Sequence, residues 1–453
     1  MAHGTNRRIR IQTLLETAEI GNPVEVTGWV RTSRFSKNVS FIHLYDGSGP
    51  QTVQVVLKAD ADLGLKSRLG GGAAVRVHGT WVASRGGKQS VEILADKVEI
   101  VGDCDPTSYP LQKKRTSFEH LRTIAHLRSR TNTHQSVLRV RNALAWQVHK
   151  FFQDRNFLWI HTPIISASDC EGAGEMFDVS VSGDPTAYFG QPTFLTVSGQ
   201  LQVECMAQSH TDVYTFGPTF RAENSNTPRH ASEFWMIEPE MAFADLDDVI
   251  SLAEDFVRSI ANGTIAQCPG DMDFFNQRIS KGVVAAIQDA VNQPFNRVTY
   301  TEAQEILAKS GRSFEYPIGW GQSLQAEHER FLAEEHFRGP VFVTDYPTDQ
   351  KAFYMKLNDG GKTVACTDLL VPRLGEIIGG SQREERLDVL QSEATRREMD
   401  MTHLDWYVDL RRWGTTPHGG FGLGFERMLM WLTGMQNIRD VIPFPRTPGS
   451  ARF

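Results

Sequence analysis

The segment Phe216–Met241 constrains the fold of this chain more than any other. Two runs of β-forming residues flank the turn-forming residues Asn224–Pro228, which predicts two strands joined by a turn. Alternate side chains on a strand share a face, so one face carries an arginine, an aromatic ring and several carboxylates: Arg221, Glu223, Phe234, Glu238 and Glu240. Burying unpaired charges is costly. The segment alone therefore leaves two interpretations open, a ligand site or a solvated face with surface ion pairs.

The chain up to about Asp103 contains five short β-rich runs separated by glycine-rich breaks, and one helix-like stretch, Ala61–Leu69. This pattern predicts a small closed barrel of the OB type. Such barrels bind single-stranded nucleic acid by stacking bases on aromatic rings beside cations. Candidates for that role are Phe41 on a strand, Arg34 and Lys37 in the preceding turn, and Gln54 on the next strand. Each residue alone is equally compatible with a structural role.

The length of 453 residues accommodates several domains, and we expect a barrel at 1–104, a hinge at 105–135 and a larger domain at 136–453. The net charge is −7, but Lys113–Arg141 holds eight lysines or arginines and one acid, Glu119. This basic segment is either a solvated linker or a surface for phosphates.

The five cysteines are scattered and form no C-x-x-C pair, which argues against a disulfide framework or a zinc ribbon. They favour a reducing compartment, and we expect the cytoplasm. No apolar segment approaches membrane-spanning length, so we expect no membrane contact.

Residues from Ser136 onward mix helical and strand patterns, which predicts an α+β domain. A helix from Ser136 is followed by a strand at 157–160 that stops before Pro163. Near the C-terminus, several glycines precede a helix that starts near Arg427, which permits close approach of a ligand or close packing of helix on sheet. Neither a Walker sequence nor a dinucleotide-binding G-x-G-x-x-G is present.

Together these segments resemble the class II aminoacyl-tRNA synthetases of the aspartate, asparagine and lysine subgroup, and among them the asparagine-specific members. The helix and strand ending at Pro163 are similar to motif 1, FRAE at Phe220–Glu223 to motif 2, and GLGFER at Gly422–Arg427 to motif 3. The resemblance covers essentially the whole chain. It implies an OB-fold anticodon-binding domain, a catalytic domain built on an antiparallel sheet flanked by helices, and a homodimer formed through motif 1.

The resemblance implies ATP-dependent activation of an amino acid to an aminoacyl adenylate, followed by transfer to tRNA. Catalytic roles are implied for Arg221, Glu223 and Arg427. The implied ATP-binding residues are Arg221, Glu223, Arg229, His230, Phe234, Glu376, His418 and Arg427. His418, Arg229 and His230 would reach the outer phosphates. ATP is a substrate, and Glu376 with Asp368 would hold Mg²⁺, which prefers hard carboxylate oxygens.

The amino-acid-binding residues implied by the resemblance are Glu171, Ser198, Gln200, Glu204 and Arg383. Val203 stands where aspartate-specific members carry a lysine, and Glu204 could accept a hydrogen bond from a substrate amide and repel a carboxylate. We therefore expect L-asparagine and tRNA(Asn) as substrates, with Arg34, Phe41 and Gln54 at the anticodon. The alternatives are aspartate specificity, or a paralogue that binds ATP or nucleic acid without charging tRNA.

Overall fold

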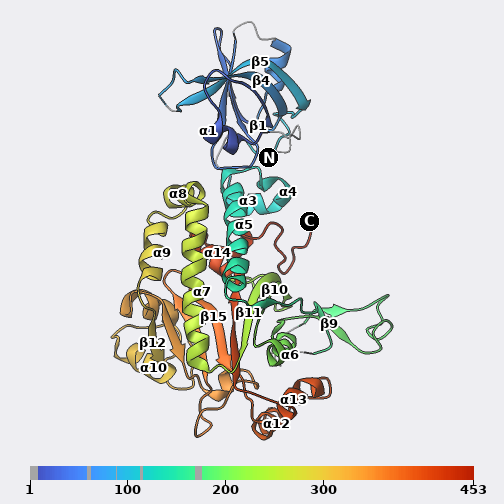
Figure 1. Ribbon diagram of the computed structural model, residues 1–453, viewed down its shortest axis with the longest axis vertical. Helices are drawn as coiled ribbons and strands as arrows, with labels where there is room; N and C mark the ends of the chain where they lie inside the picture. Colours follow the sequence, from blue (N-terminus) through green and yellow to red (C-terminus); the bar gives the residue numbers. More distant parts are fainter. Residues whose placement is uncertain (1–8, 59–62, 88, 113–115, 169–175) are drawn as a thin grey trace. The chain divides into compact units, whose positions relative to one another are not determined.

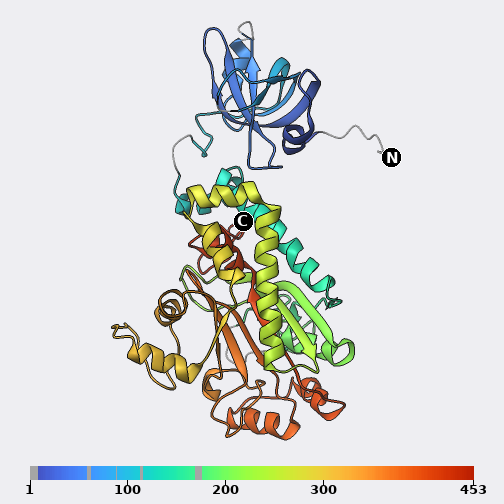
Figure 2. The ribbon, with the colours of Figure 1, turned by 60° about the vertical axis from the view of Figure 1, so that its left-hand side comes forward.

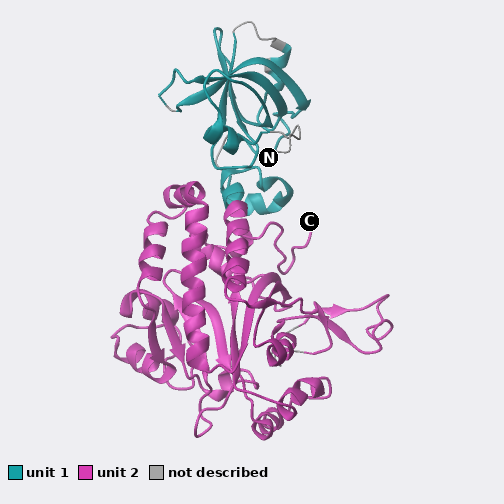
Figure 3. Cartoon of the chain, in the orientation of Figure 1, with its two compact units in different colours: residues 1–136 teal, residues 137–453 magenta. Residues whose placement is uncertain are grey.

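A computed structural model describes residues 9–58, 63–87, 89–112, 116–168 and 176–453 (Figure 1). The chain divides into two compact units, Met1–Ser136 and Val137–Phe453 (Figure 3). The first unit contains the barrel, and the second contains one large sheet with its helices.

The barrel of the first unit is closed and five-stranded, with the strand order β1-β2-β3-β5-β4. Its strands are β1 (Pro23–Arg34), β2 (Ser40–Tyr45), β3 (Val53–Leu57), β4 (Ala74–Ala83) and β5 (Val91–Gly102), and its helices are α1 (Ile11–Thr17) and α2 (Leu63–Arg68). Alternate residues such as Ile42 and Leu44 are fully buried, as the two-residue period of a strand requires. The predicted OB-type barrel is confirmed. Arg34, however, ends β1 instead of lying in the turn after it.

The basic segment is partly helical, forming α3 (Phe118–Thr123), α4 (Ala125–Arg128) and the start of α5 (Asn132–Gln153). The last helix begins four residues before the predicted Ser136. Several arginines of the segment point inward: Arg128 is buried, and Arg139 and Arg141 pair with Asp271 and Glu426, each at 2.7 Å. Three of the eight basic side chains are therefore turned toward the protein interior. Residues 113–115 lie outside the described residues.

The second unit is built on an eight-stranded sheet with the order β12-β13-β14-β15-β16-β11-β10-β6. The strands are β6 (Leu158–Trp159), β10 (Asp212–Phe220), β11 (Glu233–Ala242), β12 (Asn296–Thr299), β13 (Val341–Thr344), β14 (Cys366–Val371), β15 (Gly375–Gln382) and β16 (His418–Gly424). Neighbours from β13 to β10 pair antiparallel, and only the two edge strands β12 and β6 pair parallel. The predicted α+β fold is confirmed, with a sheet that is mixed at its edges.

The long helix α7 (Leu246–Gln267) lies along the sheet (Figure 2) and contacts β14, β15 and β16. Asp245 caps its first turn in a capping box with Asp248. Its apolar side, which includes Ile250, Phe256 and Ile260, is buried. This apolar side covers the sheet. The described residues contain no helix that is both long and apolar enough to cross a membrane.

The other helices surround the sheet, and two of them matter for the site: α6 (Gln200–His210), which contacts β10 and β11, and α13 (Asp405–Arg412), which contacts α6. The remainder are α8 (Pro269–Arg278), α9 (Val283–Asn292), α10 (Tyr300–Lys309), α11 (Ala326–Arg330), α12 (Leu387–Arg396) and α14 (Phe425–Thr433). A small sheet of β7 (Ile165–Ser166), β9 (Thr193–Leu195) and β8 (Asp178–Val179) precedes α6.

Candidate active site

Strands β10 and β11 form the hairpin expected from Phe216–Met241, with Thr219 opposite Phe234. Arg221 follows the last residue of β10, and its backbone N–H donates to the Ser232 carbonyl at 3.0 Å. This places its guanidinium carbon 5.6 Å from the centre of the Phe234 ring. A cation and an aromatic ring therefore lie together at the loop end of the hairpin.

A cavity of about 150 Å³ opens at this end of the hairpin. Its lining brings together seven of the eight residues predicted to bind ATP: Arg221, Glu223, Arg229, His230, Phe234, Glu376 and Arg427. Arg427 donates from Nη1 to the Glu376 carboxylate at 3.2 Å, and Arg229 donates to the Leu374 carbonyl at 2.7 Å. Burial lowers the pKa of His230, and the charge of Arg427 adds to this effect. The cavity thus has basic, aromatic and acidic walls suited to a nucleotide.

His418 is the exception, because the structure places it away from this cavity. It begins β16, whereas Gly422 and Gly424, which do line the cavity, are at the other end of that strand. At about 3.3 Å per residue, the two ends of the strand are roughly 20 Å apart. His418 is fully buried, and its Nε2 lies 3.1 Å from Glu204 Oε2. Its predicted role at the outer phosphates is corrected accordingly.

Two carboxylates, Asp368 on β14 and Glu376 on β15, face the space above Gly379. A Cβ atom at Gly379 would lie 3.5 Å from Asp368 Oδ1 and 3.6 Å from Glu376 Oε1. The absence of a side chain at Gly379 therefore leaves an open space between two hard oxygen donors. No described group of three or more His, Cys, Asp or Glu side chains could hold a metal ion. Mg²⁺ commonly takes one or two carboxylates and completes its shell with water and substrate phosphates. The donor pair fits that ion.

Lys351 shares this region, and sequence analysis missed it. Its Nζ lies 2.7 and 2.6 Å from the two carboxylate oxygens of Asp368 and 4.0 Å from the centre of the Tyr346 ring. Burial raises the pKa of Asp368, although Lys351 opposes the shift. The lysine therefore compensates the charge of a buried acid in the predicted metal-binding pair.

A second, fully buried cluster surrounds Glu204 on α6. Its Oε1 accepts from Gln200 Nε2 at 3.0 Å, and its Oε2 accepts from Tyr407 OH at 2.8 Å and from Arg411 Nη2 at 3.0 Å. Burial alone would raise the pKa of Glu204, but Arg411, His418 and Arg383 together outweigh it and lower the pKa. We expected Glu204 to accept from a substrate amide. In the structure the protein itself already supplies donors to both of its oxygens.

Arg383 adjoins this cluster from the end of β15. It is buried and donates from Nε and Nη2 to the carboxylate of Glu240, and from Nη1 to Ser381 Oγ at 2.7 Å. Burial raises the pKa of Glu240 to about 7, against the opposing charge of Arg383. Glu240 and Glu204, two neighbours of one site, are thus shifted in opposite directions.

Ser198 completes the described part of the predicted amino-acid site. It donates to Glu238, which also accepts from the Gly199 N–H at 3.0 Å, and so Glu238 holds the start of α6. Ser198, Gln200, Glu204 and Arg383 are brought together. The fifth predicted residue, Glu171, lies outside the described residues.

Gly420 shows why β16 is rich in glycine. A Cβ atom at this position would lie 2.0 Å from the Pro239 carbonyl oxygen and 2.6 Å from Glu240 Oε1. Of the two explanations left open by the sequence, close packing accounts for this glycine. The absence of a side chain at Gly420 leaves room for the Glu240 side chain, which is opposite it on β11.

Tyr407 and Arg411 are site residues that sequence analysis missed. They are four residues apart and therefore share one face of α13, and both are buried. The polar pair at helical spacing, shortly before His418, was the available signal. Their partner Glu204 is some 200 positions away in the chain, and a local pattern does not reveal such a pairing.

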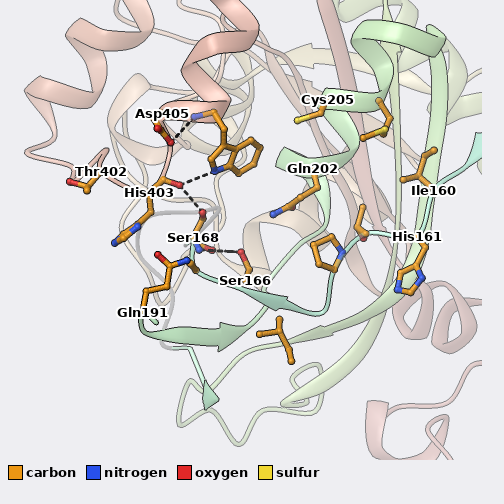
Figure 4. A pocket seen from close by; sticks show the side chains of 16 residues that line it. Ile160, His161, Ser166, Ser168, Gln191, Gln202, Cys205, Thr402, His403 and Asp405 are labelled. Atoms are coloured by element: carbon orange, nitrogen blue, oxygen red, sulfur yellow. Dashed lines mark hydrogen bonds between the residues drawn. The ribbon is translucent and has the colours of Figure 1, made fainter. Parts of the chain in front are cut away.

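A larger cavity of about 670 Å³ lies on the other side of α6 (Figure 4). It is lined by Gln202, Cys205 and Met206 of α6, and by Asp405 and Trp406 of α13. Ser168 donates to the His403 carbonyl at 3.0 Å beside it. Each of the two helices therefore has one side on this cavity and another in the Glu204 cluster.

The predicted anticodon residues share the outside of the barrel. Arg34 on β1 is directly opposite Phe41 on β2, and the Phe41 side chain is half-buried. Gln54 is opposite His43 and donates from Nε2 to Glu92 at 2.7 Å. A cation, an aromatic ring and an amide are consequently presented on neighbouring strands.

A family model of class II tRNA synthetases (D, K and N) matches residues 118–448. The chain belongs to this family. A model of OB-fold nucleic-acid-binding domains also matches residues 24–101 of this synthetase. The synthetase is 54% identical to an asparagine–tRNA ligase of Nostoc sp., over 98% of this chain and 99% of that protein. Its identity to an asparagine–tRNA ligase of Geobacter sulfurreducens is also 54%, over 99% and 100%.

Solved structures agree with this membership. The synthetase is similar to the asparaginyl-tRNA synthetase of Pyrococcus horikoshii complexed with asparaginyl-adenylate, with a TM-score of 0.89 and 31% identity over 99% of this chain and 100% of that one. It is also similar to the asparaginyl-tRNA synthetase of Entamoeba histolytica in complex with asparaginyl-adenylate, with a TM-score of 0.84 and 26% identity over 96% and 98%.

Proposed function

We propose that this synthetase ligates L-asparagine to tRNA(Asn). Asparagine and ATP form asparaginyl-adenylate and pyrophosphate, and the asparaginyl group then passes to the tRNA with release of AMP. The family membership and the relatives named asparagine–tRNA ligase support this reaction.

Activation brings two anions together, the substrate carboxylate and the α-phosphate of ATP. In our proposal Arg221 contacts both, because a guanidinium offers two parallel donors where lysine offers a point charge. Phe234 stacks on the adenine, and Arg427 covers its other face. Arg229 and His230 reach the outer phosphates, and Glu223 completes the nucleotide site. The attacking carboxylate is already ionised, so the chain contributes positioning and electrostatic stabilisation without a general base.

Asp368 and Glu376 would hold Mg²⁺ on the ATP. The ion would neutralise charge on the phosphate oxygens during transfer. Asp368 forms an ion pair with Lys351 at 2.6 Å, and Glu376 forms one with Arg427 at 3.2 Å. Both acids are thereby held in place at the edge of the cavity.

The observation that carries the choice of asparagine is the charge pairing around Glu204. Arg411 faces Glu204 at 3.0 Å, and Arg383 faces Glu240. Each arginine of the cluster thus already has a carboxylate partner. Since an unpaired buried charge is costly, aspartate would add an uncompensated negative charge where the neutral amide of asparagine adds none. A site that discriminates by polar pairing can reach large selectivity ratios.

ATP–pyrophosphate exchange with asparagine and with aspartate tests this proposal. We expect exchange with asparagine and little with aspartate, and faster exchange with aspartate would overturn the assignment. Arg221→Ala should lower exchange by roughly 10²–10³-fold, the scale of losing one group that stabilises transition-state charge. Arg297→Ala is the control, because that arginine forms an exposed pair with Asp247. Charging of unfractionated tRNA then distinguishes a ligase from a paralogue that activates asparagine without transfer.

We also propose a homodimer formed through the motif 1 segment. Around the edge strand β6 the surface carries large apolar side chains, with exposed fractions of 60% for Trp146, 46% for Leu158 and 49% for Trp159. An apolar surface beside an unpaired strand edge is typical of an interface. We propose Arg34, Phe41 and Gln54 as anticodon contacts.

The cytoplasm is the proposed location, since Cys104, Cys205, Cys268 and Cys366 are free thiols.

A further inference from the structure

Gln200 has a fixed amide orientation in the buried cluster. Its Nε2 donates to Glu204 Oε1 at 3.0 Å, and an ionised carboxylate can only accept hydrogen bonds. The amide nitrogen of Gln200 is therefore held toward Glu204, which directs its Oε1 away from that carboxylate. A substrate α-ammonium has only donors, so it needs an oxygen from Gln200 and not its nitrogen.

The orientation of Gln200 thus depends on Glu204 remaining an acceptor. A protonated Glu204 could donate to the Gln200 amide oxygen, and the amide would then turn its nitrogen toward the substrate. Full burial favours protonation of a carboxyl group. Neighbouring positive charges and hydrogen-bond donors are what oppose it.

Two side chains of helix α13 oppose the protonation of Glu204 most strongly. Arg411 is fully buried, and its Nη2 donates both to Glu204 Oε2 at 3.0 Å and to Tyr407 OH at 2.8 Å. The Tyr407 hydroxyl in turn donates to Glu204 at 2.8 Å. Burial raises the pKa of Tyr407 well above its ordinary value, so this hydroxyl keeps its proton and remains a donor.

The other groups around Glu204 belong to the sheet. His418 Nε2 on β16 is 3.1 Å from Oε2, while Nδ1 of the same ring is 2.8 Å from the Thr416 carbonyl oxygen. Arg383 Nε is 3.9 Å from Oε1 and is hydrogen-bonded to Glu240. Of the Arg411, His418 and Arg383 side chains, Arg411 makes the shortest contact with the Glu204 carboxylate. No other residue than Tyr407 and Arg411 reaches Glu204 from α13 in the described hydrogen bonds.

We propose that Arg411 and Tyr407 are positioning residues for the amino-acid substrate. They keep Glu204 an acceptor, Glu204 fixes the amide of Gln200, and Gln200 then presents its oxygen to the α-ammonium. This proposal rests on the proposed function, and on the resemblance, which implies that Gln200 contacts the α-ammonium of the amino acid. It assigns a role in amino-acid binding to a helix outside the three family motifs.

Steady-state ATP–pyrophosphate exchange tests it, with KM measured separately for asparagine and for ATP. Arg411→Met removes the charge and keeps most of the volume, and it should raise the KM for asparagine about 30-fold or more. The KM for ATP should stay within about twofold, since Arg411 does not line the nucleotide cavity. Arg411→Lys retains the charge and should recover part of the loss. Arg412→Met is the matched control, because the neighbouring Arg412 is exposed and pairs only with Asp409 among the described ion pairs.

Tyr407→Phe is the second variant, since it removes one hydroxyl and retains the ring. It should raise the KM for asparagine by roughly 3–10-fold, and it decides the matter if Arg411→Met does not fold. An unchanged KM for asparagine in a folded variant overturns the proposal. An equal rise of both KM values also overturns it, because that result indicates general damage. Failure of the wild-type protein to use asparagine would instead refute the proposed function. The KM values of the variants and of the wild type are then compared for the amino acid that the wild-type protein does activate.

Discussion

Arg427 Nη1 donates to both the backbone oxygen and the side-chain carboxylate of Glu376, at 3.2 Å in each case. This contact joins the first turn of α14 to β15 across the nucleotide cavity. Burial would raise the pKa of Glu376, but Arg427 and Lys351 outweigh it and lower the pKa. Glu376 therefore stays ionised at neutral pH and can serve as a hard ligand.

Glu376→Gln should increase the Mg²⁺ concentration needed for half-maximal exchange by at least about tenfold, the scale on which changes around a metal site weaken binding. The amide keeps the size of the side chain but removes the negative charge that an alkaline-earth ion prefers. A Mg²⁺ titration of exchange activity at saturating ATP measures the shift. Glu305→Gln, on the exposed side of α10, is the control. An unchanged Mg²⁺ requirement would remove Glu376 from the metal site.

Gly420→Ala should destabilise the second unit by about 1–3 kcal/mol, as overpacking of a core does. The added Cβ would lie 2.0 Å from the Pro239 carbonyl oxygen and 2.5 Å from Glu240 Cδ, so either the strand or the carboxylate must move. Thermal unfolding measures the loss of stability, and the KM for asparagine reports whether the Glu240 carboxylate is displaced. Gly217→Ala provides a comparison on β10, where a Cβ atom meets nothing within 4 Å. Equal stability of the two variants would contradict the packing argument.

The parts of this molecule that could be predicted from sequence are those with local signals. Short β-rich runs between glycine-rich breaks identified the strands of the barrel, and the hairpin containing Arg221 and Phe234 was visible because its turn residues are consecutive. Glu376 and Arg427 were assigned by resemblance, and the structure brings them to one cavity.

The parts that could not be predicted depend on contacts distant in sequence. His418 was placed with the phosphates by resemblance, but it begins β16, and the length of that strand separates it from Arg427. Tyr407 and Arg411 were not among the predicted site residues. Only the packing of α13 against α6 brings them to Glu204.

His134 predicts how the first unit responds to acid. It is buried, and burial together with the charges of Arg128 and Arg122 lowers its pKa to about 3. The unfolded chain, with an ordinary histidine pKa near 6.5, therefore binds more protons than the folded one between these values, and stability falls as the pH decreases. At about 1.4 kcal/mol per pH unit, this histidine removes roughly 2 kcal/mol between pH 7 and pH 5. Urea unfolding at both pH values measures the loss, and His134→Asn should abolish this contribution. Protonation of His134 in the folded state near pH 6, seen by NMR, would contradict the prediction.

Phe41→Ala should leave asparagine activation unchanged and weaken tRNA charging. Phe41 lies on the outside of the barrel opposite Arg34, where it can stack on a base while the arginine meets a phosphate. Loss of one base–aromatic stack costs about 1–3 kcal/mol, which corresponds to a rise of roughly 5–150-fold in the KM for tRNA(Asn). Exchange and charging assays on the same preparation separate the two steps. Ile20→Ala removes another exposed apolar side chain of the barrel unit and should leave both steps intact. If charging by Phe41→Ala equals that of the wild type, the anticodon surface must be sought on another face of the barrel. If exchange falls together with charging, Phe41 acts on the stability of the protein and not on tRNA.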